Sequence, residues 1–179
     1  MTRARSPLFE VVLHGPEIPN NTGNIGRTCV ATGCRLHLVH PLGFEVSEKA
    51  CRRAGLDYWP RLAVIEHQDW SAYESWEHVE RQSHAPQTPT TWCLSTKAQR
   101  PLYDARFRPG DRLVFGSETR GLPAEVLRER EATCLVLPMV PLERSLNLAT
   151  AVCAVVYEGI RQLLASGDCS LDDAGRLMG

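Results

Sequence analysis

Three loops of this chain are rich in residues whose backbone or side chain can meet a ligand. The first, IPNNTGNIGRTC, offers two closely spaced glycines and several asparagine amides, among them Asn24. Arg27 adds a permanent cation about one turn into the helix that should begin there. Such a loop suits a phosphate or a ribose. A helix start capped by Asn21 or Thr22, with a surface arginine, explains the same residues equally well.

The second loop, GSETRGLP, follows an apolar run directly. Gly116 and Gly121 bracket four polar residues, including Glu118 and Arg120, as expected of a loop folded around a flat ligand. An ordinary strand-to-helix turn with Pro123 at the helix start is the alternative. Neither this loop nor the first matches GxxxxGK[ST] or GxGxxG, so kinase and dehydrogenase functions lose their main support.

The third loop, PMVPLERSLNL, is stiffened by two prolines. Arg144, Ser145 and Asn147 follow at the start of a long apolar-faced segment. Ser145 is predicted to cap that helix, and the backbone N–H groups there suit an anion such as the carboxylate of an amino-acid-like ligand. A purely structural cap remains the competing interpretation.

Apolar runs and periodic segments alternate along the chain. Strands are predicted at 8–13, 36–40, 62–66, 91–95, 112–116 and 134–137, and helices at 21–33, 47–55, 69–82, 123–130 and 145–165. The near-continuous apolar strands predict an α/β fold, in which a parallel sheet is covered by helices on both faces. Ligands of such sheets bind beyond the carboxyl ends of the strands, where all three loops lie.

The composition is that of a globular protein, with 43% hydrophobic and 23% charged residues. We expect one domain over 1–165 and a loosely ordered tail over 166–179. No apolar run approaches the roughly 20 residues of a membrane span, and the N-terminus lacks a secretion signal. A formal net charge of -1 argues against a general polyanion binder but permits a local basic patch.

The seven cysteines form no CxxC pair and mostly have apolar neighbours. This spacing favours free thiols in a reducing cytoplasm and argues against a metal site.

Together the three loops strongly resemble the motifs of the SpoU branch of the SPOUT methyltransferases. NTGNIGRTC, LVFGSETRGLP and LPMVPLERSLNLATAVCAVVYE match in the family's order and span nearly the whole chain. RRAGLDYW, at 52–59, is similar to a segment typical of the subgroup that methylates the wobble cytidine or uridine of tRNA. The resemblance implies S-adenosylmethionine as cofactor, a ribose 2′-hydroxyl of tRNA as substrate, a C-terminal deep trefoil knot and an obligate homodimer.

The resemblance also implies roles for individual residues. Arg27 is expected at the reacting ribose, and it should bind phosphate or stabilise a developing alkoxide because arginine is a poor proton acceptor. Its expected neighbours on the substrate side are Asn24, Arg120, Arg144 and Asn147. The implied cofactor contacts are Leu94, Gly116, Glu118, Leu137 and Ser145.

The proton acceptor stays unassigned, because Glu118 is chemically able to act but fits a structural or cofactor-side role as well. Arg52 and Arg53 are expected to contact RNA, unless they belong to a solvated helix face. Two positions depart from the family pattern: Ser117, where proline is common, and Gly26, where a larger residue is usual.

Two other functions remain open. One is a non-catalytic RNA-binding dimer that keeps the knot but has lost turnover. The three intact loops argue against it. The other is a family enzyme acting on ribosomal RNA or another tRNA position. The lack of an appended RNA-binding domain favours the wobble-type subgroup over this second alternative.

Overall fold

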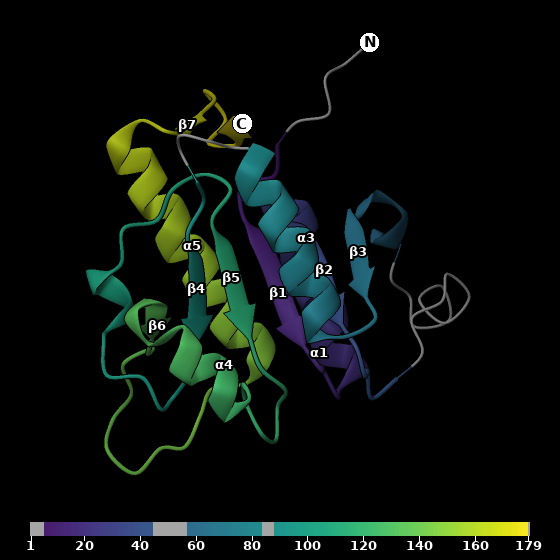
Figure 1. Cartoon of the computed structure of the whole chain (residues 1–179). Helices are drawn as coiled ribbons and strands as arrows, with labels where there is room; N and C mark the ends of the chain where they lie inside the picture. Colours follow the sequence, from purple (N-terminus) through teal and green to yellow (C-terminus); the bar gives the residue numbers. More distant parts are fainter. Residues whose placement is uncertain (1–5, 45–56, 84–87, 179) are drawn as a thin grey trace.

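The fold is built on one six-stranded sheet whose neighbouring strands all run parallel (Figure 1). The computed structural model describes residues 6–44, 57–83 and 88–178. In the order β3-β2-β1-β5-β4-β6, the strands are Val64–His67, Arg35–Val39, Glu10–His14, Arg112–Phe115, Thr91–Leu94 and Cys134–Leu135. The predicted α/β class with a parallel sheet is confirmed.

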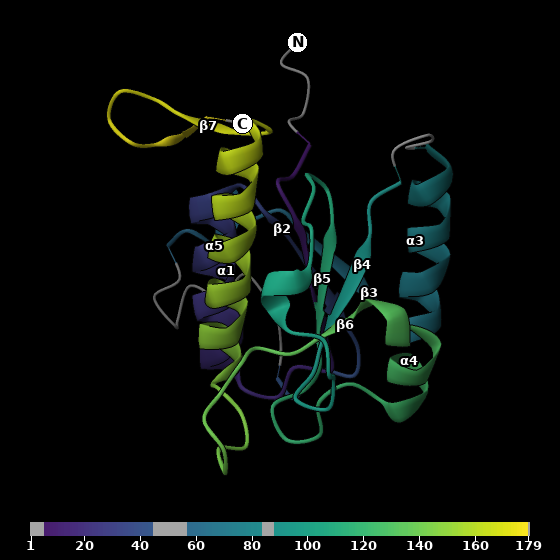
Figure 2. The same ribbon diagram turned by 90° about the vertical axis from the view of Figure 1, so that its left-hand side faces the viewer.

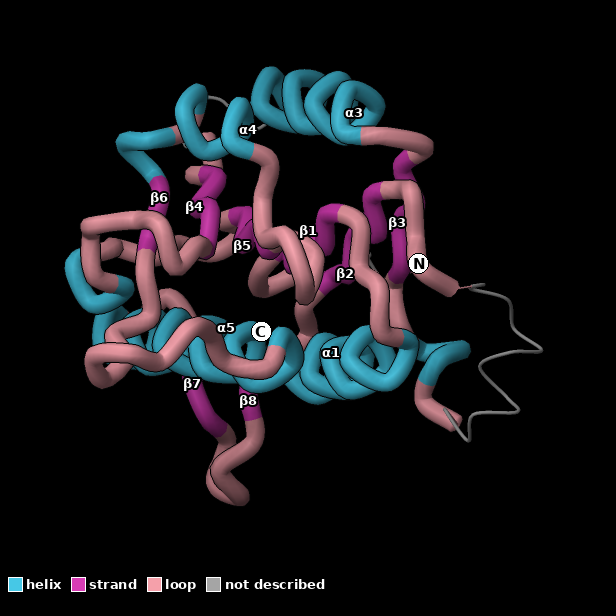
Figure 3. Tube along the Cα trace, turned by 90° about the horizontal axis from the view of Figure 1, so that it is seen from below, coloured by secondary structure: helices cyan, strands magenta, loops and turns pink. Residues whose placement is uncertain are grey.

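Helices cover both faces of the sheet, as Figures 2 and 3 show. On one face lie α1 (Pro19–Thr32) and α5 (Leu148–Ser166); on the other lie α3 (Trp70–Ser83) and α4 (Ala124–Glu129). Short 3-10 turns occupy Trp59–Arg61, Leu102–Asp104 and Glu131–Thr133. The helix predicted at 47–55 falls outside the described residues.

The central strands are largely apolar because both of their faces are buried. In β1, Val11 and Leu13 belong to the core under α1 and α5, whereas Val12 belongs to the core under α3 and α4. The central helix α5 has the length and hydropathy of a membrane-spanning segment. Its apolar face is instead packed on the sheet, where Gly159 lies so close to Phe9 that a Cβ atom would approach its ring to 2.6 Å.

The start of α1 differs from the sequence-based expectation. The N-cap position is Ile18, not Asn21 or Thr22, because Pro19 supplies the first helical residue with its φ already restricted. Arg27 therefore lies more than two turns into the helix rather than one. The C-terminal end agrees with the prediction, since Gly33 closes α1 in the left-handed conformation at φ 70°.

A small hairpin occupies the tail, where the composition predicted no regular structure. Its strands β7 (Ser170–Leu171) and β8 (Leu177–Met178) pair antiparallel beyond the end of α5 (Figure 2). The side chain of Asp172 accepts hydrogen bonds from the backbone N–H of Ala174 at 3.0 Å and of Arg176 at 2.8 Å. These local bonds order the turn without a large apolar core.

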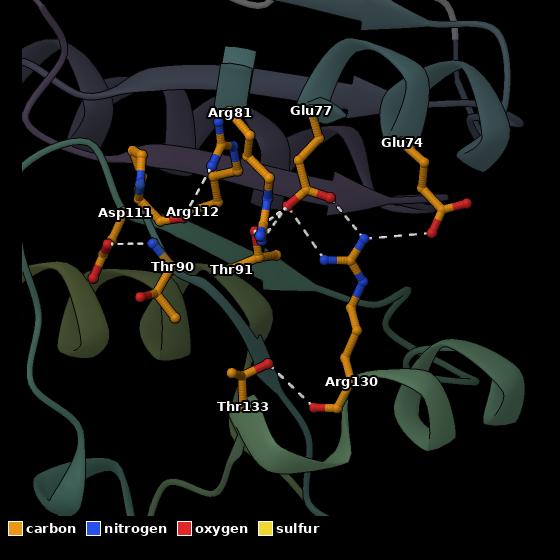
Figure 4. A network of polar contacts seen from close by, with 10 residues as sticks. Glu74, Glu77, Arg81, Thr90, Thr91, Asp111, Arg112, Arg130 and Thr133 are labelled. Carbon is orange, nitrogen blue, oxygen red and sulfur yellow. Dashed lines mark hydrogen bonds and ion pairs between the residues drawn. The ribbon is translucent and has the colours of Figure 1, made fainter. Parts of the chain in front are cut away.

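A buried ionic cluster holds α3 against the sheet and α4 (Figure 4). Glu77 accepts hydrogen bonds from Arg130 at 2.7 Å, from Arg81 at 3.2 Å and from the hydroxyl of Thr91. Burial raises the pKa of Glu77, but these hydrogen bonds outweigh it and the net pKa is lowered. Three elements distant in sequence are thereby joined through one carboxylate.

A second polar cluster lies buried beneath α3. His37 is fully buried, and its two ring nitrogens lie 2.9 Å from His67 Nε2 and 2.9 Å from a carboxylate oxygen of Glu10. Burial lowers the pKa of both histidines, and with His37 nearby the pKa of His67 falls to about 4. Both imidazoles are therefore neutral in the folded protein at neutral pH.

Acid should destabilise the fold in a window set by these histidines. The unfolded chain takes up protons near the ordinary histidine pKa of 6.5, whereas folded His67 stays neutral down to about pH 4. The free energy of unfolding therefore keeps its full contribution from His67 above pH 6.5 and decreases as the pH falls from 6.5 toward 4. Thermal unfolding should show this decrease, and His67→Gln should make it shallower. The exposed His78→Gln is the control, and equal slopes for both variants would refute the assignment.

Candidate active site

A pocket of about 600 Å³ lies at the carboxyl ends of β4, β5 and β6. The loops that follow these three strands form its wall, and the start of α1 adds Ile18 and Asn21. Because the strands run parallel, the segments after them meet at one edge of the sheet although they are far apart in sequence. The pocket lies where the sequence predicted a ligand.

The pocket wall contains all the predicted cofactor residues: Leu94, Gly116, Glu118, Leu137 and Ser145. It also contains three of the predicted substrate-side residues, Arg120, Arg144 and Asn147. Asn24 and Arg27 are not part of the wall and lie exposed on α1. Arg52 and Arg53 fall outside the described residues.

The loop after β5 turns back sharply on itself, and two glycines make this possible. A Cβ atom on Gly116 would lie 2.0 Å from the carbonyl carbon of Gly121 and 2.1 Å from the backbone nitrogen of Leu122. Gly121 has a φ of 70° and donates its N–H to the carbonyl of Ser117 at 2.9 Å. The two glycines predicted to bracket this loop are thus required by its backbone.

Glu118 joins this loop to the start of α1. Its carboxylate accepts hydrogen bonds from the backbone N–H of Glu17 at 2.8 Å and of Ile18 at 3.3 Å, and from Asn21 Nδ2 at 2.8 Å. In return the carboxylate of Glu17 accepts from the backbone N–H of Thr119 at 3.0 Å and from its hydroxyl at 2.8 Å. Three donors from one segment give Glu118 a structural role at the pocket wall.

Asn147 extends the same network to α5. Its Nδ2 donates to Asn21 Oδ1 at 2.9 Å, and its Oδ1 accepts from the backbone N–H of Ala149 at 2.9 Å and of Thr150 at 3.3 Å. Asn147, not Ser145, is therefore the cap of α5, which begins at Leu148. Because the Asn147 side chain occupies these helix N–H groups, they are not open to an anion as the sequence suggested.

Arg27 has a different environment. Its side chain is 64% exposed, and its guanidinium lies 4.7 Å from the centre of the Tyr58 ring. One of its nitrogens is 4.0 Å from a carboxylate oxygen of Asp57, which is itself 85% exposed. An exposed ion pair at this distance contributes little energy, so the aromatic ring restricts the cation more than the carboxylate does.

The composition of the wall fits a nucleoside that carries a charged tail. Apolar side chains, including Leu94, Leu137 and Leu122, can cover a flat base, while Lys97 and Ser145 offer polar groups at the same wall. The turn at Gly116 brings a backbone segment against the cavity. S-adenosylmethionine, the cofactor implied by the resemblance, is a ligand of this kind. In the described part of the chain, no group of three or more His, Cys, Asp or Glu residues is placed to hold a metal ion.

Sequence reasoning did not anticipate two residues of the network. No local pattern marks Glu17 as a functional residue, and the sequence around Asn21 predicts only a helix cap or an amide donor. Their partners, Thr119 and Glu118, lie about a hundred residues away. The turn signal at Gly15-Pro16 marks where β1 ends, but nothing in the local pattern indicates that the next residue contacts a distant loop.

Two substitutions at Asn147 should separate its roles. Asn147→Ala removes the helix cap and should lower the free energy of unfolding by about 1 kcal/mol. Asn147→Asp keeps an oxygen for the N–H groups of Ala149 and Thr150 but cannot donate to Asn21 Oδ1. It should therefore preserve the cap of α5, leave Asn21 Oδ1 without its donor and weaken S-adenosylmethionine binding, as measured by calorimetry. Wild-type affinity in Asn147→Asp would show that this bond does not shape the pocket.

Comparisons with known proteins agree with this architecture. The model of the SpoU rRNA Methylase family matches residues 8–157. A tRNA (cytidine(34)-2'-O)-methyltransferase of Saccharophagus degradans is 47% identical over 161 residues, which are 89% of this chain and 99% of that protein.

Solved structures are similar over most of the chain. One, concerned with the 2-OH methylation of C/U34 on tRNA, has a TM-score of 0.78 at 42% identity and covers 90% of this chain and 99% of its own. The SpoU methyltransferase AviRb from Streptomyces viridochromogenes, in complex with AdoMet, has a TM-score of 0.78 at 23% identity. That match covers 91% of this chain and 60% of the other, and it supports the fold. On the family match and the 47% identity, the chain belongs to the SpoU methylase family.

Proposed function

We propose that this protein transfers a methyl group from S-adenosylmethionine to the ribose 2′-hydroxyl of the wobble cytidine or uridine of tRNA. The observation that carries the proposal is the meeting of all three family-type loops at one pocket, where hydrogen bonds join them. The 47% identical relative, which matches 89% of this chain over 99% of its own length, is named for this reaction at cytidine 34.

The cofactor supplies an electrophilic methyl group on a sulfonium sulfur. The task of the protein is then to align the ribose oxygen with that methyl group and to exclude other nucleophilic positions of the RNA. In the proposal, Leu94 and Leu137 cover the base of the cofactor, the backbone at Gly116 approaches it, and Ser145 contacts its polar part. Glu118 supports this wall from behind through its bonds to α1.

Arg27 acts on the substrate side. A guanidinium stays protonated at neutral pH, so it stabilises the negative charge that develops on the 2′-oxygen or holds the neighbouring phosphate. Glu118 is not assigned as proton acceptor, because three donors already engage its oxygens. Around the pocket the exposed cations Lys97, Arg120 and Arg144 are suited to tRNA phosphates, and we extend this role to Arg52 and Arg53.

The proposed functional unit is a cytoplasmic homodimer that meets through the face formed by α1 and α5. On α5, Tyr157 is 53% exposed and lies on the same side as the exposed Ala154. On α1 the exposed residues at helical spacing are Asn24, Arg27 and Ala31. A second copy on this face would bring Asn24 and Arg27, which are absent from the pocket wall, next to the partner's pocket.

The deep trefoil knot implied by the resemblance also belongs to this proposal. In the proposal it lies in the C-terminal part of the chain, which also supplies the third loop of the pocket wall.

Transfer of labelled methyl to tRNA that lacks wobble 2′-O-methylation tests the reaction. The wild-type protein should label the wobble ribose, and mapping of the labelled nucleotide identifies it. Arg27→Ala should lower turnover by at least about a hundredfold because the developing charge loses its cation. Its affinity for S-adenosylmethionine should be unchanged, since Arg27 lies outside the pocket wall.

Each other outcome has a distinct meaning. Label at another nucleotide or in ribosomal RNA would replace the proposed substrate. Cofactor binding without transfer to any RNA would favour the non-catalytic dimer. Unchanged turnover in Arg27→Ala would remove Arg27 from the reaction.

The assembly is tested separately by size-exclusion chromatography with light scattering. The wild-type protein should have about twice the chain mass of 20.0 kDa. A double substitution of Ala154 and Tyr157 by glutamate places charges on the proposed interface and should give a monomer without methyl transfer. A stable monomer of the wild-type chain would contradict the proposed dimer.

A further inference from the structure

The end of the wobble-type run and the residues just after it, from Tyr58 to Leu62, pack closely against α1 beside Arg27. Tyr58 is only 3% exposed, and its hydroxyl donates a hydrogen bond to the carbonyl oxygen of Gly23. Leu62 is buried against the same helix. The aromatic ring therefore has a fixed place relative to the first family-type motif.

Gly26 makes this close approach possible. A Cβ atom there would lie 2.9 Å from Leu62 Cδ2, 3.2 Å from the Trp59 ring and 3.5 Å from the Tyr58 ring. Position 26 is where this chain departs from the larger residue usual in the first motif. The missing side chain leaves the space into which the segment from Tyr58 to Leu62 fits.

The guanidinium of Arg27 lies over the Tyr58 ring at 4.7 Å from its centre. Arg27 is 64% exposed, so its long side chain has few other walls to restrict it. The face of an aromatic ring attracts a cation and is itself flat, which suits a planar guanidinium. Arg27 contacts two groups, the Tyr58 ring and Asp57. The Tyr58 ring is held by buried neighbours, whereas the Asp57 side chain is 85% exposed.

We propose that Tyr58 is a positioning residue for the methyl transfer, acting through Arg27. Its ring holds the guanidinium in one direction before the substrate arrives, and its hydroxyl locks the ring to the helix that carries Arg27. A cation oriented in advance stabilises developing charge without first being reorganised. This inference rests on the proposed function, because it requires that Arg27 acts at the reacting ribose.

Substitutions that keep or remove the ring test the proposal. Tyr58→Phe keeps the ring but loses its hydrogen bond to Gly23, so kcat should fall less than in variants without a ring. Tyr58→Leu and Tyr58→Met fill the space without an aromatic face, and each should lower kcat about tenfold while leaving S-adenosylmethionine binding unchanged. Tyr103→Leu is the matched control, since Tyr103 is 65% exposed and lies outside the pocket wall. Two aliphatic replacements keep the test usable if one of them does not fold.

A double-mutant cycle with Arg27→Gln, which removes the cation, distinguishes positioning from a general structural effect. If Tyr58 acts through Arg27, Tyr58→Leu should reduce turnover much less in the Arg27→Gln protein than in the wild type. Equal reductions in both backgrounds, or wild-type kcat in a folded Tyr58→Leu or Tyr58→Met, would overturn the proposal.

Separate results test the role of Arg27 and the role of Tyr58. Full turnover by Arg27→Ala would refute the role of Arg27 in the proposed function itself. An inactive Arg27→Ala combined with a fully active Tyr58→Leu would refute only the role of Tyr58.

Discussion

The hydrogen bonds that run from Glu118 through Asn21 to Asn147 are the constraint on which the rest of the site depends. They connect the loop after β5, the start of α1 and the start of α5, across separations of 97 and 126 residues. Asn21, at the centre of the network, is buried and Glu118 is partly buried, so loss of either neighbour leaves a buried polar atom of Asn21 unsatisfied. The parallel sheet makes the network possible, because it gathers these segments at one edge.

The two faces of the sheet are stabilised in different ways. Under α3, buried charges and imidazoles around Glu77 and His37 are matched with partners, which fixes that helix in one orientation. Under α5 the contacts are apolar, and the outer side of that helix still exposes Tyr157. The first face is a closed layer, whereas the second leaves an aromatic ring exposed on the outer side of its helix.

The chemistry proposed for the site relies on placement more than on reactive groups. Among the described residues, the pocket wall carries no histidine or cysteine, and the carboxylate that it does contain, Glu118, is engaged by α1. The cation assigned to the ribose lies on a separate surface and is oriented by an aromatic ring. Such a division suits a reaction in which the methyl donor is already activated and alignment of the two substrates lowers most of the barrier.

The sequence alone determined the α/β class, the parallel sheet and eight residues of the pocket wall, because strand periodicity, glycine-bracketed turns and family-type motifs are local signals. Tertiary structure decided which residue caps α5, which donors hold Glu118, and that Arg27 lies outside the wall on the ring of Tyr58. It also determined that the residues after Gly167 form an antiparallel hairpin. Ser145 and Asn147 are both good caps in sequence, and only contact with Asn21 in space distinguishes them. Contacts between segments about a hundred residues apart leave no periodic pattern, so the folded chain alone reveals them.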